Sequence, residues 1–322
     1  MNNNDMEISI DISVVLITYR HEKYIANALD SILMQKSSLS IEVLVGEDNS
    51  PDDTAQILRQ YEKMYPGRIT VIYNSKNIGA SRNLFNLLCR AKGRYIAMLE
   101  GDDYWLDESR LQVLYEFLEN NSEYEGVSHR RERRNQDGEV VGYDPKDKVV
   151  GQAINLRKYH RDMEFSIMGC MFKNCFLENS SVYLTAVTAA RNACDCVIAH
   201  IVLNRGPVFV LENCLGVYRE LSGESNYCSN TRQDKVELDS IAEYRAIVRL
   251  FGNSLYYRKK ISTCTFNALM FLIKRKMNIE KHEFWQYISF WEKIMFLLFF
   301  PYNLTSRALL HIKGRFSGHK AN

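Results

Sequence analysis

Short apolar runs alternate with amphipathic stretches through the first 121 residues, and this alternation limits the fold more than any other feature. Four runs rich in β-branched residues resemble strands, and each precedes a segment with apolar residues at helical spacing. Near-continuous apolar strands separated by helices predict an α/β fold with a mostly parallel sheet covered on both faces. The predicted strands are 12–18, 41–47, 69–74 and 94–100, and the predicted helices are 22–35, 51–65, 79–91 and 107–121.

Composition excludes several other classes of protein. A chain of 322 residues with 46% apolar residues and 5 prolines can bury a large core, so it is neither disordered nor fibrous. Its 8 cysteines form no CxxC pair, and its first residues lack the basic and apolar regions of a signal peptide. These features predict a globular protein of a reducing, cytoplasmic compartment.

The pattern changes after residue 125. Residues 129–143 are typical of a hairpin with an Asp-Gly turn, and helices dominate from about 234 onward. No repeat or low-complexity linker separates the parts. The expected organisation is therefore one catalytic domain with two halves, 1–125 and 126–233, followed by a helical tail, 234–322.

Charge is divided between the two ends of the chain. Residues 249–322 contain 13 Lys and Arg against 3 Asp and Glu, whereas the first 248 residues contain 28 basic and 36 acidic residues. An acidic front predicts a cation site, and a basic, aromatic tail predicts contact with an anionic surface.

The stretch "AMLEGDDYWL" sets three carboxylates, Glu100, Asp102 and Asp103, directly after the last predicted strand. Ligands of parallel sheets bind at the carboxyl ends of the strands. Carboxylates this close cost several kcal/mol unless some are protonated or a cation lies among them. Oxygen ligands suit Mg²⁺ or Mn²⁺. The alternative is an ordinary solvated turn.

Four segments together resemble the family 2 glycosyltransferases, inverting enzymes of GT-A fold, and the EGDDYW form is similar to bacterial O-antigen and capsule enzymes. The resemblance covers residues 10–125 strongly and 165–226 weakly. It implies a nucleotide-diphospho-sugar transferase fold with 1–125 as the nucleotide-sugar half, 126–233 as the acceptor half, and a helical C-terminal extension. The segments are "ISVVLITYRHEKYIANALDSIL", "EVLVGEDNSPDDT", "NIGASRN" and "AKGRYIAMLEGDDYW".

The resemblance also implies roles for individual residues. Glu47 and Glu100 stand where the family commonly has Asp, so each side chain reaches one methylene further. The residues expected to hold uridine are Thr18, Tyr19, Glu47 and Asp48, with Arg82 near the nucleotide, Glu100 at the ribose or metal, Asp102 on the metal, and Asp103 in support.

In the second half, the family's catalytic base is an acid that opens a helix, and Asp195 matches it. Cys194 before it departs from the family pattern, and a plain helix cap is the alternative role. Asp162 and Glu164 are the other candidates for the base. Arg219 lies in the segment where a family His commonly follows; this chain has Leu221 there, so Arg219 is expected to supply the positive charge.

Two further motifs leave alternatives open. Trp105 either walls the sugar site or anchors the following helix in the core. The arginines of 130–134 either meet an acceptor diphosphate or belong to a solvated hairpin. They lack interleaved aromatic residues, so no nucleic-acid partner is predicted.

The aromatic stretch 282–304 contains charges at its centre, and its longest uncharged part, 294–306, is shorter than the roughly 20 residues that span a bilayer. With flanking basic residues it is typical of a helix lying on an anionic membrane. The alternatives are a core helix or a homodimer contact.

The resemblance implies an inverting hexosyltransferase, the acidic cluster predicts that it uses Mn²⁺ or Mg²⁺, and the basic, aromatic tail predicts that it lies on the inner face of the cell membrane. The resemblance implies a UDP-sugar donor, with glucose or galactose expected and GlcNAc or GalNAc as alternatives. It implies β-transfer to an undecaprenyl-diphosphate-linked sugar in O-antigen or capsule synthesis. The rival functions are a sugar-phosphate nucleotidyltransferase, which would require a Gly-rich loop that "TYRHEKY" lacks, and a non-catalytic nucleotide-sugar-binding assembly protein.

Overall fold

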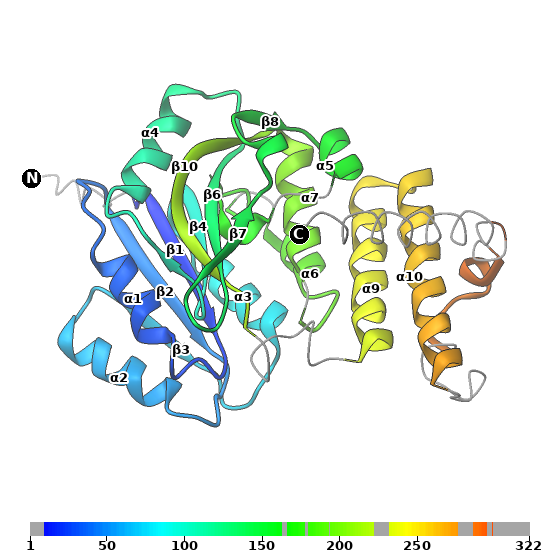
Figure 1. Ribbon diagram of the computed structural model, residues 1–322, viewed down its shortest axis with the longest axis horizontal. Helices are drawn as coiled ribbons and strands as arrows, with labels where there is room; N and C mark the ends of the chain where they lie inside the picture. Colours follow the sequence, from blue (N-terminus) through cyan, green and yellow to red (C-terminus); the bar gives the residue numbers. More distant parts are fainter. Residues whose placement is uncertain are drawn as a thin grey trace, which may run out of the picture. The chain divides into compact units, whose positions relative to one another are not determined.

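The computed structural model describes residues 10–162, 166–177, 180–192, 194–221, 232–275, 286–294 and 298. The chain divides into two compact units, Met1–Ser229 and Asn230–Asn322. The first unit contains the sheet and the second is helical (Figure 1).

Four parallel strands form one half of the sheet in the first unit, in the order β3-β2-β1-β4. Every residue of β1 is buried, and alternate side chains enter opposite faces; Ile12, Val14 and Leu16 belong to one core cluster. The predicted α/β fold is confirmed. The strands are β1 (Ile12–Thr18), β2 (Ile41–Glu47), β3 (Thr70–Tyr73) and β4 (Tyr95–Glu100).

Beyond β4 the sheet is mixed rather than parallel. The order continues β9-β6-β10-β5, where β9 runs antiparallel to both β4 and β6, and β10 runs parallel to β6. The expected hairpin is present, with β7 antiparallel to β6 and Gly138 at φ +82° in its turn. The strands are β5 (Tyr104–Trp105), β6 (Gly126–Arg134), β7 (Val140–Asp144), β8 (Gln152–Ile154), β9 (Met171–Lys173) and β10 (Val208–Arg219).

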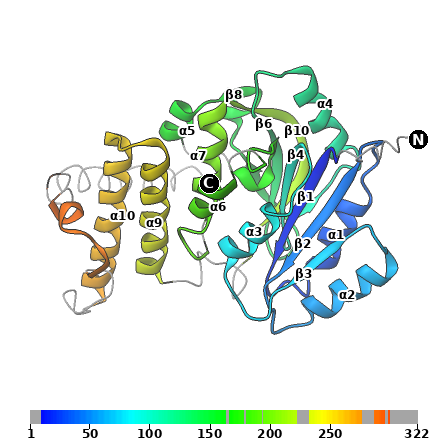
Figure 2. The same cartoon turned by 180° about the vertical axis from the view of Figure 1, so that it is seen from behind.

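Helices cover both faces of this sheet (Figures 1 and 2). The apolar sides of α1, α2 and α4 share one core cluster with alternate residues of β1, β2 and β4. On the opposite face α3 packs on β1 and β2, with α6 beside it and α7 beyond. The helices are α1 (Ile25–Leu33), α2 (Thr54–Met64), α3 (Ala80–Leu88), α4 (Arg110–Asn120), α5 (Leu156–Asp162), α6 (Ser180–Val187) and α7 (Asp195–Arg205), with 3₁₀ turns at Asp147–Val149 and Ile167–Gly169.

The start of α2 differs from the prediction. The sequence predicts a helix over 51–65, but the helix begins at Thr54. The Asp52 carboxylate accepts hydrogen bonds from the Thr54 amide at 3.2 Å and from its hydroxyl at 2.6 Å. Such side-chain bonds to nearby backbone favour a turn over a helix. Residues 51–53 therefore form a turn before the helix.

The second unit contains two long helices, α9 (Gln233–Phe251) and α10 (Leu255–Lys274), which lie side by side (Figures 1 and 2). Among the described residues, no helix has both the length and the apolar character needed to cross a membrane. Most of the aromatic stretch 282–304 lies outside the described residues; its described part is 286–294 and 298.

Candidate active site

The carboxyl ends of three parallel strands meet at one edge of the sheet, as the sequence predicts. In the strand register, Thr18 is opposite Glu47, and Ile17 is opposite Glu100. The loops continue the pairing, because the Asp48 amide donates to the Thr18 carbonyl at 3.1 Å. Side chains from residues 18, 47–48 and 100–103 are therefore neighbours although they are far apart in sequence.

Gly101 allows the acidic loop to lie against the end of β1. A Cβ atom at this position would stand 2.7 Å from both the Thr18 hydroxyl and the His21 Nδ1 atom. No ordinary side chain fits at that distance. The close approach brings the Asp102 carboxylate, whose side chain is 21% exposed, to 3.8 Å from His21 Nε2. Of the loop's two aspartates, Asp102 is the one that water or a ligand can reach.

Asp103 points inward and is buried. Its carboxylate accepts a hydrogen bond from the Arg219 amide at 2.9 Å and lies 3.7 Å from the Arg131 guanidinium. Burial, followed by repulsion from Asp102, raises the pKa of Asp103 to about 8, although both arginines act in the opposite direction. The loop is thus anchored by Asp103 and presents Asp102.

Glu100 interacts electrostatically both with the aspartates of the acidic loop and with Asp195. Burial, then the negative charges of Asp102 and Asp195, raise the pKa of Glu100 well above its usual range. Asp103 raises this pKa further, and Arg131 lowers it. The acid cluster, Glu100, Asp102 and Asp103, therefore has more negative charge than its surroundings neutralise, and Asp195 lies close enough to add to it.

Asp195 is the first residue of α7, as the sequence predicts, with Cys194 as the N-cap residue. The residue is exposed, yet the protein around its carboxylate removes water and raises its pKa. Arg131 and a backbone amide partly offset this effect. A carboxylate with a raised pKa is a better proton acceptor than an ordinary one. Of the other candidates for the base, Glu164 and the side chain of Asp162 lie outside the described residues.

Glu47 and Asp48 are buried and hold the loops around them. Glu47 accepts from the amides of Asn49 and Ser50, at 3.1 and 2.7 Å. Asp48 accepts from the amides of Ile78 and Gly79, at 2.9 and 2.8 Å. Each carboxylate has further lone pairs for a ligand. Both therefore shape the loops that border this edge of the sheet.

Arg219 is held by several groups of its own protein. Its guanidinium donates to the Asp102 carbonyl and to Asn27 Oδ1 at 2.6 Å, and it lies over the rings of Tyr24 and Tyr104 at 5.2 and 4.4 Å. It therefore fixes the acidic loop from the side of β10. The sequence suggested only a positive charge near a ligand.

The remaining predicted residues occupy different environments. Tyr19 is partly exposed after β1, and Arg82 is exposed in the first turn of α3. Trp105 is buried in the core, and the Arg110 guanidinium lies 4.1 Å from its ring. This placement agrees with the alternative that Trp105 anchors α4, and of these two neighbouring aromatic residues Tyr104 is the one that is partly exposed.

The arginines of β6 all pair with carboxylates of the protein. Arg131 is buried between Asp103 and Asp144 and supports the acidic loop, a role that sequence reasoning missed. No feature of the sequence shows which arginine of this hairpin is buried, because that depends on the strand order. The other pairs are Arg130 with Asp147, Arg133 with Glu220 and Arg134 with Glu132.

His21 is a second site residue that sequence reasoning missed. Its ring lies between the Thr18 hydroxyl, at 3.2 Å, and Asp102. Its amide donates to the Thr54 hydroxyl at 2.9 Å. Its position three residues after β1 was the available signal.

The acid cluster fits a divalent cation that shares its ligands with a substrate. Within the described ranges, no three His, Cys, Asp or Glu side chains are arranged to hold a metal ion on their own. Mg²⁺ and Mn²⁺ at phosphate sites usually take one or two protein carboxylates and complete their coordination with phosphate and water. Asp102, accessible and next to Glu100, provides such a partial site.

Comparison of the chain with known structures supports the fold. The structure of TarS from S. aureus in complex with UDP matches with a TM-score of 0.59 and 16% identity, over 84% of this chain and 77% of that one. The mannosyltransferase PcManGT from Pyrobaculum calidifontis, in complex with GDP-Man and Mn²⁺, matches with a TM-score of 0.56 and 15% identity, over 98% of this chain and 84% of that one. At these identities the likeness concerns the fold alone.

Sequence comparisons identify the family. An uncharacterized protein of Mycobacterium tuberculosis is 37% identical over 111 residues, 34% of this chain and 32% of that protein. The putative teichuronic acid biosynthesis glycosyltransferase TuaG of Bacillus subtilis is 34% identical over 163 residues, 50% of this chain and 60% of TuaG. These alignments span a third to three fifths of the relatives' lengths. The family description "Glycosyl transferase family 2" matches residues 13–181, more than half of the chain, and the chain therefore belongs to glycosyl transferase family 2.

Proposed function

We propose that this family 2 member is an inverting, metal-dependent hexosyltransferase that uses a UDP-sugar. The observation that carries the proposal is the acid cluster at the carboxyl edge of the parallel strands, with Asp195 within electrostatic reach on another element. A binding protein without catalytic activity has no need for a fourth carboxylate, Asp195, poised beside the three of the acid cluster.

The nucleoside would lie at the ends of β1 and β2. Thr18 and Tyr19 come from the first strand end, and Glu47 and Asp48 hold the loops on the next. Arg82, exposed at the start of α3, is free to approach an anionic ligand. Ligands of open α/β sheets bind at this edge, which supports the assignment.

Asp102 and Glu100 would hold a divalent ion, Mn²⁺ or Mg²⁺, together with the donor diphosphate. When bound, this ion would neutralise the charge that develops on the departing nucleoside diphosphate. The chain itself holds Asp102 in place, because Gly101 fits against β1 and Arg219 binds the Asp102 carbonyl. Preorganised charge of this kind stabilises a transition state without further rearrangement.

Asp195 would accept the proton of the acceptor hydroxyl. Its raised pKa and its place at the start of α7 suit this role. Direct attack by that hydroxyl inverts the anomeric centre, so an α-linked donor gives a β-linked product.

Donor and metal assignments also draw on the similar proteins. TarS is described with UDP and with UDP-GlcNAc, and PcManGT with GDP-Man and Mn²⁺. TuaG is named for teichuronic acid biosynthesis. For this chain we infer a UDP-hexose donor and a lipid-diphosphate-linked sugar acceptor, in assembly of an O-antigen, capsule or related cell-surface polysaccharide. The basic helical unit would then lie on the inner face of the cell membrane.

A donor screen with the purified chain tests the proposal. UDP-sugars are supplied with Mn²⁺ or Mg²⁺ and a short lipid-diphosphate-sugar acceptor, and NMR of the product reports its anomeric configuration. Transfer with inversion is expected. Asp195→Asn should lower kcat roughly 10²- to 10⁴-fold with UDP affinity unchanged. Asp137→Asn, in the exposed hairpin turn, is the control. Retention of configuration, or full activity in Asp195→Asn, would refute the mechanism.

A further inference from the structure

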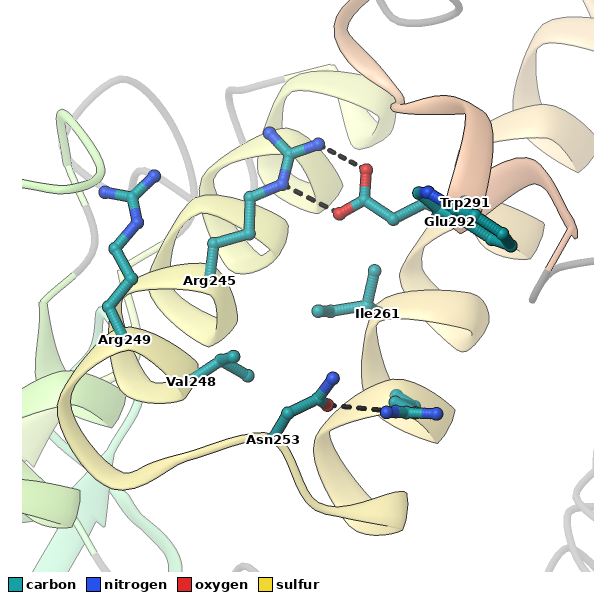
Figure 3. A pocket seen from close by; sticks show the side chains of 8 residues that line it. Arg245, Val248, Arg249, Asn253, Ile261, Trp291 and Glu292 are labelled. Carbon is teal, nitrogen blue, oxygen red and sulfur yellow. Dashed lines mark hydrogen bonds and ion pairs between the residues drawn. The ribbon is translucent and has the colours of Figure 1, made fainter.

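The helical second unit contains a pocket of about 480 Å³ between α9, α10 and the short helix at 290–294 (Figure 3). Its volume falls within the range of about 300 to 1,000 Å³ that is typical of small-molecule sites. Nothing in the proposed sugar transfer uses this pocket. It is lined by Arg245, Val248, Arg249, Asn253, Arg258, Ile261, Trp291 and Glu292.

One of its three arginines forms a fixed part of the wall. Arg245 donates from Nε to Glu292 Oε1 at 2.8 Å and makes a second bond to the other carboxylate oxygen, as Figure 3 shows. It also donates to the Tyr287 carbonyl at 3.2 Å and lies over the Tyr287 ring. Its charge is balanced by Glu292, and its Nε and one terminal nitrogen are engaged in these bonds.

The other two arginines retain their charge. Arg249, at the end of α9, and Arg258, on α10, are both exposed. Arg258 donates from Nε to Asn253 Oδ1 at 3.0 Å, which orients the guanidinium without neutralising it. In the part of the chain that the structure describes, no carboxylate lies within ion-pair distance of either arginine. Three arginines and one glutamate leave the lining with a net charge of +2.

The rest of the lining is apolar. Val248 and Ile261 face the space between the helices, and Trp291 is 72% exposed beside it. An exposed indole next to aliphatic side chains is unfavourable in water and favours a ligand with hydrocarbon. A small soluble anion would use only the arginines, and a neutral apolar ligand would leave them without a counterion. The lining therefore suits an anion that carries a hydrocarbon chain.

We propose that this pocket binds the phosphate group of an anionic phospholipid. Arg258, whose guanidinium Asn253 orients, would donate to the phosphate oxygens, for which the planar guanidinium is well suited, and Arg249 would add positive charge at the edge of the pocket. Val248, Ile261 and Trp291 would contact the first carbons of the chain, with the indole at headgroup depth. The proposal deepens the membrane contact of the proposed function by assigning it to a defined pocket.

Vesicle sedimentation with the full chain tests this proposal. The probes are vesicles of phosphatidylcholine alone and vesicles with added phosphatidylglycerol. The pocket variant is Arg249→Ala with Arg258→Ala. The control variant, Lys274→Ala with Arg275→Ala, removes the same charge from the exposed end of α10, outside the pocket lining. Circular dichroism verifies that both variants are folded.

Binding to the phosphatidylglycerol vesicles is expected. The pocket variant should bind roughly thirtyfold more weakly than the control variant, because it loses charge-assisted hydrogen bonds as well as charge. In about 1 M NaCl, where the Debye length is about 3 Å, diffuse attraction is screened. Wild type and control should retain binding there, whereas the pocket variant should not. On binding, tryptophan fluorescence should shift to the blue, and Trp291→Phe should remove that shift.

Equal losses in the pocket and control variants would overturn the proposal, because diffuse charge would then explain the binding. Competition by inorganic phosphate or UDP at concentrations that leave the vesicles intact would also overturn it in favour of a soluble anion. Failure of the sugar-transfer proposal is a separate result. Sedimentation requires neither donor nor metal, and transfer to a short acceptor requires no vesicle.

Discussion

Replacing Asp103 by Asn should change how the stability of the ligand-free protein depends on pH. Asp103 is only 3% exposed, and burial with repulsion from Asp102 raises its pKa to about 8. The unfolded chain has an ordinary Asp pKa of about 3.9. Between these two values the folded state binds a proton that the unfolded state has released. The stability from this group is complete below about pH 3.9 and is lost as pH rises toward 8.

The magnitude follows from linkage. One additional bound proton changes the free energy of unfolding by about 1.36 kcal/mol per pH unit, so over the two units from pH 5 to pH 7 the wild type should lose on the order of 3 kcal/mol from this source. Asn cannot titrate, but its side-chain oxygen can still accept from the Arg219 amide. Between pH 5 and pH 7, the free energy of unfolding of the variant should therefore fall less than that of the wild type, by about that amount.

Urea unfolding at pH 5, 6 and 7, with a chelator present, measures the difference. The proton belongs to the coupled acid cluster, so Glu100→Gln is measured beside Asp103→Asn. The exposed Asp137→Asn is the control. If neither cluster variant flattens the pH dependence relative to the control, the cluster holds no extra proton and our account of its electrostatics is refuted.

Two further substitutions test how elements are held. Gly101→Ala should lower kcat/KM roughly 100-fold, because a Cβ 2.7 Å from two side-chain atoms displaces the acidic loop. Gly142→Ala, where the nearest atom is 3.6 Å away, should leave activity unchanged, and equal activities would contradict the positioning role. Burial alone would raise the pKa of Glu292, but hydrogen bonds from Arg245 and Ser289 lower it overall. The stability that this carboxylate adds to the folded protein is therefore present above its pKa in the unfolded chain, and it is lost as pH falls through its pKa in the folded protein. Glu292→Gln should therefore increase amide hydrogen exchange in 286–294 at pH 7 but not at pH 3, and unchanged exchange at pH 7 would show that the ion pair does not hold this segment.

The parallel half of the fold was predictable because its signals are local. The predicted strands 12–18 and 41–47 agree residue for residue with β1 and β2. Their shared edge follows from the rule that parallel strands end together. Once the strands were placed, the meeting of Glu47 with Thr18 required no further information.

The second half of the fold was harder to predict from the sequence. β8 and β9 have three residues each, too few to show a period, and β9 inserts between β4 and β6 through contacts that only tertiary structure determines. Arg131 looked like part of an exposed basic run, yet the Asp103 and Asp144 carboxylates make its burial tolerable. His21 belongs to the site because Gly101 lets the acidic loop approach it.

The central claim is that the acid cluster is stabilised by a divalent cation shared with the donor diphosphate. Calorimetric titration of the protein with UDP, in Mn²⁺ and then with the ion removed by a chelator, tests it most directly. Our account predicts binding roughly 5- to 150-fold tighter with Mn²⁺, a difference that Asp102→Asn should abolish. Equal UDP affinity in the two conditions would contradict the claim.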